Sequence, residues 1–183
     1  MNLTATDVRY ILAGRGRDVY DRLVGAAGAP DLSGVLSVQI GRETERLNLE
    51  WLHRRLDGSS LYRLPTAALV TGTIEPIGGQ CVVSRGRYRA KADGFLVVPD
   101  LGTVVVEAKH VSEGRFAGQI QAEYLPQLFV TMHVCGARFG VLSVFYGLSR
   151  HTGYFVAWDE AYWAGIEREV EAFVTHLELG IPP

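Results

Sequence analysis

The first third of the chain is dominated by apolar residues at helical spacing. Residues 7 to 23 form the first predicted helix, with Thr6 as its N-cap. Residues 25 to 30 contain glycines and end in proline, and they break this pattern. Ser33 then caps a second, longer predicted helix that runs to about Leu56. Its apolar positions recur mostly three or four residues apart, as on one face of a helix: Leu36, Ile40, Leu47 and Trp51.

The rest of the chain alternates short β-branched runs with longer helical patterns. Short strands are expected over residues 61 to 98, where glycine and proline interrupt the apolar runs. The later predicted elements are helices at 115–134 and from Asp159 to about Leu179, and strands near 138–147 and 153–158. This order predicts one α/β domain over residues 1–183, with a central mixed β-sheet flanked by helices.

A predicted β-hairpin lies at the middle of the chain. Phe95 to Val98 and the β-branched run Val104 to Val106 form its strands. Between them, Pro99 to Gly102 supplies the proline and glycine of a tight turn. Folding about this turn places Asp93 opposite roughly residues 107 to 109.

A charged trio, Asp93, Glu107 and Lys109, follows from this register. Side chains alternate along a strand, so Glu107 and Lys109 share a face that Asp93 can reach. Two carboxylates and a lysine on one strand face form a site for Mg²⁺ and a cleavable phosphate. Asp100 is the competing acid, but its place at the turn tip is roughly 20 Å from Glu107, too far to share a metal ion. The alternative for the trio is a surface hairpin with a chance ion pair.

The composition is that of an ordinary globular domain, with 48% hydrophobic and 21% charged residues. No apolar run reaches the roughly 18 residues of a membrane span, and the N-terminus lacks the layout of a signal peptide. We therefore expect a cytoplasmic protein with no membrane partner. Cys81 and Cys135, with no Cys-x-x-Cys motif, are expected to be buried thiols. Three tryptophans are expected in the core rather than as base-stacking platforms: Trp51, Trp158 and Trp163.

Basic residues alternate along the stretch that leads to Asp93. The net charge of −2 does not by itself indicate a nucleic-acid-binding protein. At strand spacing, however, four basic side chains would point the same way as Asp93: Arg85, Arg87, Arg89 and Lys91. A row of cations leading to two acids fits a phosphate backbone that approaches a metal site. The alternative is a solvated face of an edge strand, where basic residues block aggregation.

Several short segments occur in an order and spacing that fit a known family. They are Leu3–Asp7 with Gly14–Arg17 and Tyr20, Gly41–Glu45, Ala92–Phe95, Glu107–Lys109, and Tyr124–Met132 with Gly136. Together they resemble the PD-(D/E)xK nuclease superfamily, and most closely the lambda-exonuclease-like (YqaJ-type) viral recombinases. This resemblance implies a restriction-endonuclease-like core. The chain departs from the family pattern at Ala92, which replaces a proline, and in the longer interval between Asp93 and Glu107.

The resemblance also implies Mg²⁺-dependent hydrolysis of phosphodiester bonds, with Mn²⁺ as a substitute. Asp93 would be the central metal ligand, and Glu107 with the Ala108 carbonyl would complete the protein ligands of one ion. Glu45 would hold a second ion, and its alternative is an exposed helix acid. Lys109 would orient or polarise the attacking water and offset charge in the transition state.

Other residues take supporting roles by the same resemblance. Gln127 would fix Lys109 or contact DNA, and its alternative is a buried helix glutamine that caps a backbone group. Arg15 and Arg17 stand where the family has an arginine that receives a DNA 5′-phosphate, and their alternative is ordinary cations near a helix C-terminus. Weaker candidates for support are His110 and Glu123.

Three functions remain open at this point. The first is a metal-dependent DNA exonuclease, 5′→3′ on duplex ends, that feeds a single-strand annealing protein in phage-type recombination or repair. Rings are common among such enzymes, which makes a homo-oligomer plausible. The second is a PD-(D/E)xK endonuclease of the restriction or repair type. The third is a nuclease-like fold that serves only as a DNA-binding module, which the presence of all three trio residues disfavours.

Overall fold

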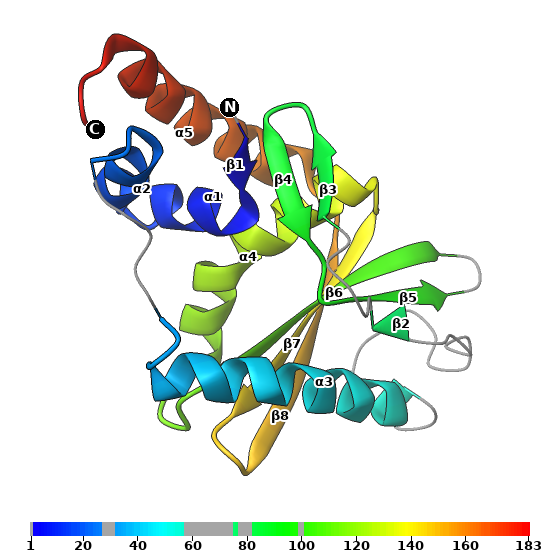
Figure 1. The fold of residues 1–183 in the computed structure, drawn as a ribbon. Coiled ribbons are helices and arrows are strands. Elements are labelled where there is room, and N and C mark those ends of the chain that lie inside the picture. Colours follow the sequence, from blue (N-terminus) through cyan, green and yellow to red (C-terminus); the bar gives the residue numbers. More distant parts are fainter. Residues whose placement is uncertain (1, 27–31, 57–74, 77–81, 99–100) are drawn as a thin grey trace.

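Helices and strands alternate along the chain in the computed structural model (Figure 1), which describes residues 2–26, 32–56, 75–76, 82–98 and 101–183. Its elements are β1 (Leu3–Thr4), α1 (Ala5–Leu12), α2 (Gly16–Leu23), α3 (Leu36–Leu56), β2 (Glu75–Pro76), β3 (Val82–Arg85), β4 (Tyr88–Lys91), β5 (Gly94–Val98), β6 (Gly102–Val111), α4 (Ala117–Cys135), β7 (Phe139–Tyr146), β8 (Arg150–Ala157) and α5 (Glu160–Leu179). The described strands form a five-stranded sheet, β2-β5-β6-β7-β8, and a three-stranded sheet, β1-β4-β3.

The five-stranded sheet is mixed and is covered by helices on both faces, which confirms the predicted fold class. Strand β6 pairs antiparallel with β5 and parallel with β7. On one face, Leu49 and Leu52 of α3 pack against a cluster that includes Val104 and Val106 of β6. On the other face, α4 packs against a cluster that includes Val105. Alternate residues of β6 therefore face α3 and α4.

The smaller sheet belongs to an upper lobe built around α1, α2 and α5 (Figure 1). Its core contains Leu3 and Val8 from the N-terminal segment, with Val170 from α5. Residues of α4 such as Phe129 and Val130 belong to the same cluster. Helix α4 therefore packs against both the upper lobe and the main sheet, and it carries side chains to the boundary between them.

The first predicted helix is divided, and its cap is misplaced. The structure has α1 and α2 where one helix over residues 7 to 23 was expected. Gly14 adopts a left-handed conformation with φ of 74°, which ends the helical path between them. The N-cap is Thr4 rather than Thr6, because the Thr4 hydroxyl accepts from the Asp7 amide while the Asp7 carboxylate accepts from the Thr4 amide.

The other element predictions are close to the observed bounds. Helix α3 begins at Leu36, after Ser33, and ends at Leu56 as predicted. Asp159 caps α5 by accepting from the Tyr162 amide at 3.0 Å. Strand β8 starts earlier than expected because it pairs with β7 along its whole length. Residues 61–74 and 77–81, where short strands were predicted, lie outside the described residues.

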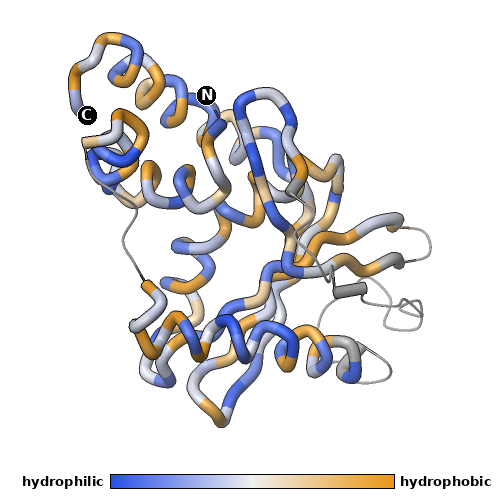
Figure 2. The backbone as a smooth tube through the Cα atoms, viewed as in Figure 1, coloured by the Kyte–Doolittle hydropathy of each residue, from blue (hydrophilic) through white to orange (hydrophobic). Residues whose placement is uncertain are grey.

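Burial of α3 changes along its length. Its buried apolar residues, Leu49 and Leu52, lie in the second half. Toward the start, Leu36 keeps 67% of its surface exposed and Ile40 keeps 39%. Hydrophilic and hydrophobic residues alternate along this helix (Figure 2). The helix is therefore anchored to the sheet mainly through its second half.

The tryptophan and cysteine predictions are confirmed in part. Trp163 is buried in the upper-lobe core, whereas Trp158 and Trp51 are half-buried. Cys135 is also half-buried, at the last residue of α4, and Cys81 lies outside the described residues. None of the helices in the described ranges is both long and apolar enough to cross a membrane.

Candidate active site

The hairpin register brings Asp93 to Glu107 and Lys109, as the sequence predicts. Gly94 pairs with Val106, so the residue before Gly94 comes opposite Glu107. The Asp93 carboxylate accepts a hydrogen bond from the Ala108 amide at 2.8 Å, and its oxygen lies 3.9 Å from the Lys109 ammonium. Lys109 also pairs directly with Glu107. The competing acid, Asp100, lies outside the described residues.

Glu107 is the most deeply buried member of the trio, with 1% of its surface exposed. Its Oε1 accepts hydrogen bonds from the Lys109 ammonium and, at 2.5 Å, from the Gln127 side-chain amide. Its Oε2 is also buried, but it has no hydrogen-bond partner among the residues that the structure describes. A buried carboxylate oxygen without a partner is costly, so this atom is placed to receive one.

The charges of the trio depend on one another. Burial, and then the nearby charge of Asp93, raises the pKa of Glu107 to about 7. For Lys109, burial opposes the charged form, but the carboxylates of Glu107 and Asp93 outweigh it and raise the pKa of the ammonium. Lys109 therefore remains a cation at neutral pH. Charge stabilisation is the chemistry that an ammonium group in this position can supply.

Gln127 reaches the site from α4, and its described contact is with Glu107 rather than with Lys109. It was predicted to fix Lys109 or to contact DNA. It donates to Glu107, and a contact with DNA stays a prediction. Tyr124, one turn earlier on the same helix, places its ring centroid 5.5 Å from the Lys109 ammonium. Helix α4 therefore supplies a polar and an aromatic neighbour to the same pair of strand residues.

Glu45 approaches from the opposite helix, α3. It is half-buried and lines a cavity of about 340 Å³ together with Ala108, Lys109 and Gln127. Burial, and then the charge of Asp93, raises the pKa of Glu45. Its predicted alternative was an exposed helix acid, for which Arg42 and Arg46 are the nearest basic residues in the sequence. Arg46 instead pairs with Glu50 at 3.3 Å.

The oxygen donors of this site fit a hard divalent cation. Asp93 and Glu107 present carboxylates on the strands, and Glu45 presents one in the adjoining cavity. The Ala108 carbonyl lies on the strand edge that faces Asp93, because the amide of the same residue binds Asp93. Across the described ranges, no three acidic, histidine or cysteine side chains converge closely enough to enclose an ion by themselves. Mg²⁺ does not require such an enclosure, since it is commonly held by one or two carboxylates, waters and substrate phosphates.

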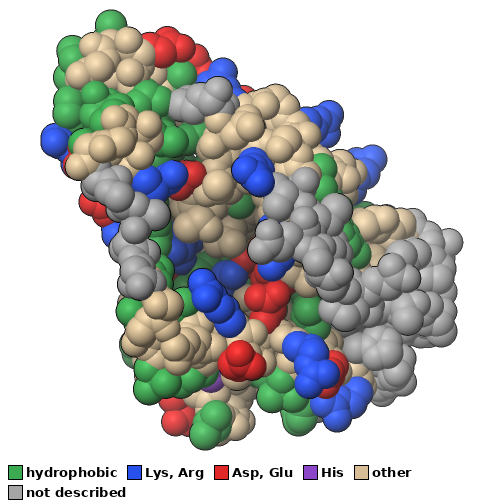
Figure 3. Space-filling view, viewed as in Figure 1, with side chains coloured by type: hydrophobic (Ala, Val, Ile, Leu, Met, Phe, Trp, Pro, Cys, Tyr) green, Lys and Arg blue, Asp and Glu red, His purple; other side chains and the backbone are tan. Residues whose placement is uncertain are grey.

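A cavity of about 320 Å³ adjoins the trio and extends toward the upper lobe. Asp93, Glu107, Lys109 and Gln127 line it from the main sheet and α4. The other lining residues come from the N-terminal segment and β4: Thr4, Ala5, Thr6, Arg89, Ala90 and Lys91. Acidic and basic side chains gather around a hollow between α3 and the upper lobe (Figure 3).

The predicted row of four cations is wrong, because a turn interrupts it. Gly86 has φ of 59° in the β3–β4 turn, so Arg85 pairs with Tyr88 on the opposite strand of a hairpin. The Arg85 guanidinium donates to the His133 carbonyl at 3.1 Å, and Arg87 pairs with Glu171 at 2.5 Å.

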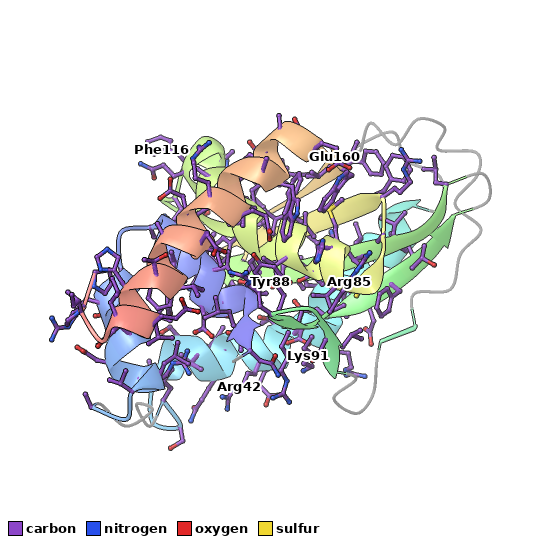
Figure 4. All side chains as sticks on the ribbon, turned by 90° about the horizontal axis from the view of Figure 1, so that it is seen from above. Arg42, Arg85, Tyr88, Lys91, Phe116 and Glu160 are labelled. Atoms are coloured by element: carbon purple, nitrogen blue, oxygen red, sulfur yellow. The ribbon has the colours of Figure 1, made fainter. Side chains whose placement is uncertain are left out.

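Only the second half of the row remains at the site. Arg89 and Lys91, both exposed, line the cavity with Asp93. Arg85 pairs with Tyr88 and Val82 with Lys91, so Lys91 lies on the face of the hairpin opposite to Arg85 and Tyr88 (all three are labelled in Figure 4). The site therefore has two of the four predicted basic residues.

The two arginines of the second helix are not brought to the trio. Arg15 pairs with Asp18 at 2.7 Å and Arg17 with Asp21 at 2.9 Å, and all four side chains lie on α2 or at its start. In the part of the chain that the structure describes, neither arginine is among the residues that line the two cavities at Asp93 and Glu45. They stand at the beginning of α2 rather than near the end of a long first helix, because Gly14 divides that helix.

Sequence reasoning missed Arg9, which lines the same cavity as Glu45 and Lys109. Its guanidinium pairs with Glu123 at 3.1 Å and lies 4.7 Å from the ring centroids of both Tyr10 and Tyr124. Arg42 of α3 lines this cavity too. No local pattern marks Arg9, because its position depends on α1 packing against α4. Of the weaker candidates, Glu123 pairs with Arg9 and Arg115, while His110 contacts Thr44.

Comparisons with known proteins were made for both sequence and structure. No protein-family model matches the chain, and a search of curated proteins finds no significant match. Solved structures do match. The alkaline exonuclease of Laribacter hongkongensis has a TM-score of 0.65 at 16% identity, over 98% of this chain and 89% of that chain. Its complex with dAMP gives a TM-score of 0.63 at 17% identity, with the same coverage.

A phage-related exonuclease from Haemophilus somnus 129PT is also similar, with a TM-score of 0.67 at 13% identity over 98% of this chain and 94% of that chain. The likeness covers nearly the whole of each molecule. The chain therefore has the fold of these exonucleases, as the resemblance in its motifs implied.

Proposed function

We propose that this protein is a metal-dependent deoxyribonuclease that hydrolyses phosphodiester bonds, acting as an exonuclease. The observation that carries the proposal is the buried Glu107 carboxylate. One of its oxygens is held by Lys109 and Gln127, and the other has no partner among the described residues. A fold shared with an alkaline exonuclease and a phage-related exonuclease supports the choice of exonuclease.

The residues divide the work by their chemistry. Asp93, Glu107, Glu45 and the Ala108 carbonyl would hold Mg²⁺, or Mn²⁺ in its place. A bound ion would supply Lewis-acid polarisation of the phosphate and a more acidic bound water. Lys109 keeps its charge at neutral pH and would offset the negative charge that develops on the phosphate oxygens. Gln127 and Lys109 together hold Glu107 in a single orientation.

The cavity lining supports a polyanionic substrate. Arg89 and Lys91 border the cavity that contains Asp93, and Arg9 and Arg42 border the cavity that contains Glu45. Cations on both sides of the acids would contact phosphates next to the one that is cleaved. DNA is therefore the proposed substrate. The motif resemblance adds four further proposals. The enzyme would act 5′→3′ on duplex ends and serve phage-type recombination or repair in the cytoplasm. It would work with a single-strand annealing partner and assemble as a homo-oligomer.

One experiment tests the activity. Linear and covalently closed circular duplex DNA are incubated with the protein in Mg²⁺ or in EDTA. Loss of the linear form alone, only with Mg²⁺, is expected, and cutting of the circle would instead identify an endonuclease. Linear DNA labelled at the 5′ or 3′ end reports polarity. Glu107→Ala and Lys109→Ala should be inactive. If the wild type also fails to cleave either DNA, the protein is a non-catalytic module.

A matched pair of α3 variants tests the metal role of Glu45. Glu45→Gln should raise the Mg²⁺ concentration needed for half-maximal cleavage. Glu43→Gln is the control, because Glu43 is exposed and points about 200° round the helix from Glu45. Equal Mg²⁺ requirements for the two variants would remove Glu45 from the proposed ligands.

A further inference from the structure

A buried asparagine joins α3 to the strand that carries the trio. Asn48 has 1% of its surface exposed. Its side-chain amide donates hydrogen bonds to the Lys109 carbonyl and to the Ser143 carbonyl, each at 3.1 Å. Its own oxygen accepts from the Ser143 hydroxyl at 2.5 Å. Both donors and the acceptor of this buried amide are therefore satisfied by β6 and β7.

Only an amide side chain can make this set of contacts. Two backbone carbonyls require two donors, and the Ser143 hydroxyl donates to an acceptor on the same group. An aspartate at position 48 would present oxygens to two carbonyls, and a leucine would leave both carbonyls without this donor. The contact is therefore specific to asparagine in both chemistry and size.

A second polar contact joins the same elements one helical turn earlier. The Thr44 hydroxyl lies 3.1 Å from the His110 Nδ1 atom. Thr44 and Asn48 are spaced to share one face of α3. Glu45 lies between them in the sequence, and the β6 residues that they contact, Lys109 and His110, immediately follow Ala108. Two polar contacts therefore bracket the turn of α3 that carries Glu45.

Apolar packing alone does not fix this turn. The buried leucines of α3, Leu49 and Leu52, follow Asn48, whereas Ile40 and Leu47 keep 39% and 47% of their surfaces exposed. Hydrophobic contacts are also tolerant of small shifts and rotations, unlike a three-point hydrogen-bonded contact. The register of α3 on β6 near Glu45 therefore depends on Asn48.

We propose that Asn48 is a positioning residue that fixes the Glu45 carboxylate relative to Glu107 and Lys109, and so sets the affinity of the site for a divalent cation. The inference rests on the proposed function, because it assigns Glu45 to cation binding. Asn48 itself would not touch the ion or the substrate. It acts through the placement of α3, as supporting hydrogen bonds do around metal ligands.

The test measures cation binding without DNA. Mn²⁺ is titrated calorimetrically into wild type, Asn48→Leu and Val170→Ala. Val170 is a buried residue of α5 in the upper-lobe core, a different cluster from the one that contains the α3 leucines. Asn48→Leu is expected to weaken Mn²⁺ binding by about 10-fold or more, and Val170→Ala to leave it unchanged. In a Glu45→Gln background, Asn48→Leu should cause no further loss, because the carboxylate that it positions is gone.

Two results would overturn the proposal. One is a folded Asn48→Leu protein that binds Mn²⁺ as tightly as wild type, and the other is an equal loss with and without Glu45. If Asn48→Leu does not fold, Thr44→Val replaces it, because this variant removes the contact with His110 at a half-buried position. Thr44→Val should also weaken Mn²⁺ binding, and an unchanged affinity counts against the proposal. A wild type that binds Mn²⁺ but does not cleave DNA would refute the proposed function alone.

Discussion

The Gln127 side-chain amide donates to the Glu107 carboxylate at 2.5 Å, which joins the middle of α4 to the centre of β6. A hydrogen bond to the charged form of a buried carboxylate favours ionisation. Gln127→Leu keeps the approximate size but removes the donor, so the pKa of Glu107 should rise further. Cleavage at pH 7 should fall about 10-fold to 100-fold and recover in part at higher pH. Gln119→Leu, exposed on the same helix, is the control for the pH–rate profile.

The metal-free protein should lose stability as the pH rises. The pKa of Glu107 is raised to about 7 in the folded state, so the folded protein retains this proton over a range in which the unfolded chain releases it. The stabilising contribution is complete below pH 4.5 and is lost as the pH passes through about 7. Urea unfolding in EDTA should show a decline of up to about 3 kcal/mol over this window, and Glu107→Gln should flatten it. An unchanged slope in that variant would contradict the assignment.

The choice between two aspartates can be tested directly. Asp93→Asn should lower Mg²⁺-dependent cleavage at least about 100-fold, because Asp93 is the acid that reaches β6 through the Ala108 amide. Asp100→Asn should retain wild-type activity. Rates are measured on a labelled linear duplex. The opposite result would place the metal ligand in the turn and refute the proposed site.

The two halves of the basic stretch should differ in DNA binding. Arg89→Ala and Lys91→Ala each remove an exposed cation that lines the cavity with Asp93. Each substitution should lower the affinity for DNA and reduce the slope of log affinity against log salt concentration by about one. Arg87→Ala is the matched control, because Arg87 is already paired with Glu171. Binding is measured in EDTA over a series of salt concentrations. Equal losses of DNA affinity in Arg87→Ala and Arg89→Ala would mean that both halves of the basic stretch contact DNA.

Close packing of α4 on β7 predicts a stability difference between two glycines. A Cβ at Gly140 would lie 2.9 Å from Leu128 and Met132 side-chain atoms, so Gly140→Ala should lower the free energy of unfolding by about 1–3 kcal/mol. Gly118 lies within α4 with nothing near its Cβ position, and Gly118→Ala should raise stability by about 0.5–1 kcal/mol. Denaturant unfolding measures both. A tolerated alanine at Gly140 would mean that the Leu128 and Met132 side chains can move aside.

Local sequence was sufficient for the central hairpin. The β-branched run before Glu107 and Gly102, whose φ of 76° suits a glycine, fit the observed register, and the alternation of side chains then places Glu107 and Lys109 on one face. The long helices were also predictable from apolar spacing and from the Asp159 cap. These features depend on residues close together in the chain.

Features that depend on distant packing were not predictable in the same way. The basic stretch has strand-like alternation on both sides of Gly86, and only the turn at this glycine shows that Arg85 faces away from Lys91. Arg9 belongs to the site because α1 packs on α4, which no local pattern records. The Gln127 contact with Glu107 likewise requires the placement of α4 on the sheet.

The unequal burial of α3 makes the two sides of the site differ in stability. The β6 side is held within the sheet, whereas the start of α3 can open. Leu36 and Ile40 are exposed at the start of the helix, while Leu49 and Leu52 hold its second half to the sheet. Local opening is easiest where few apolar contacts are lost, so backbone amides before Glu45 should exchange with solvent at lower free energy than those after Asn48. Glu45 stands at the border of these regions, where the helix can fray from its start while β6 stays intact.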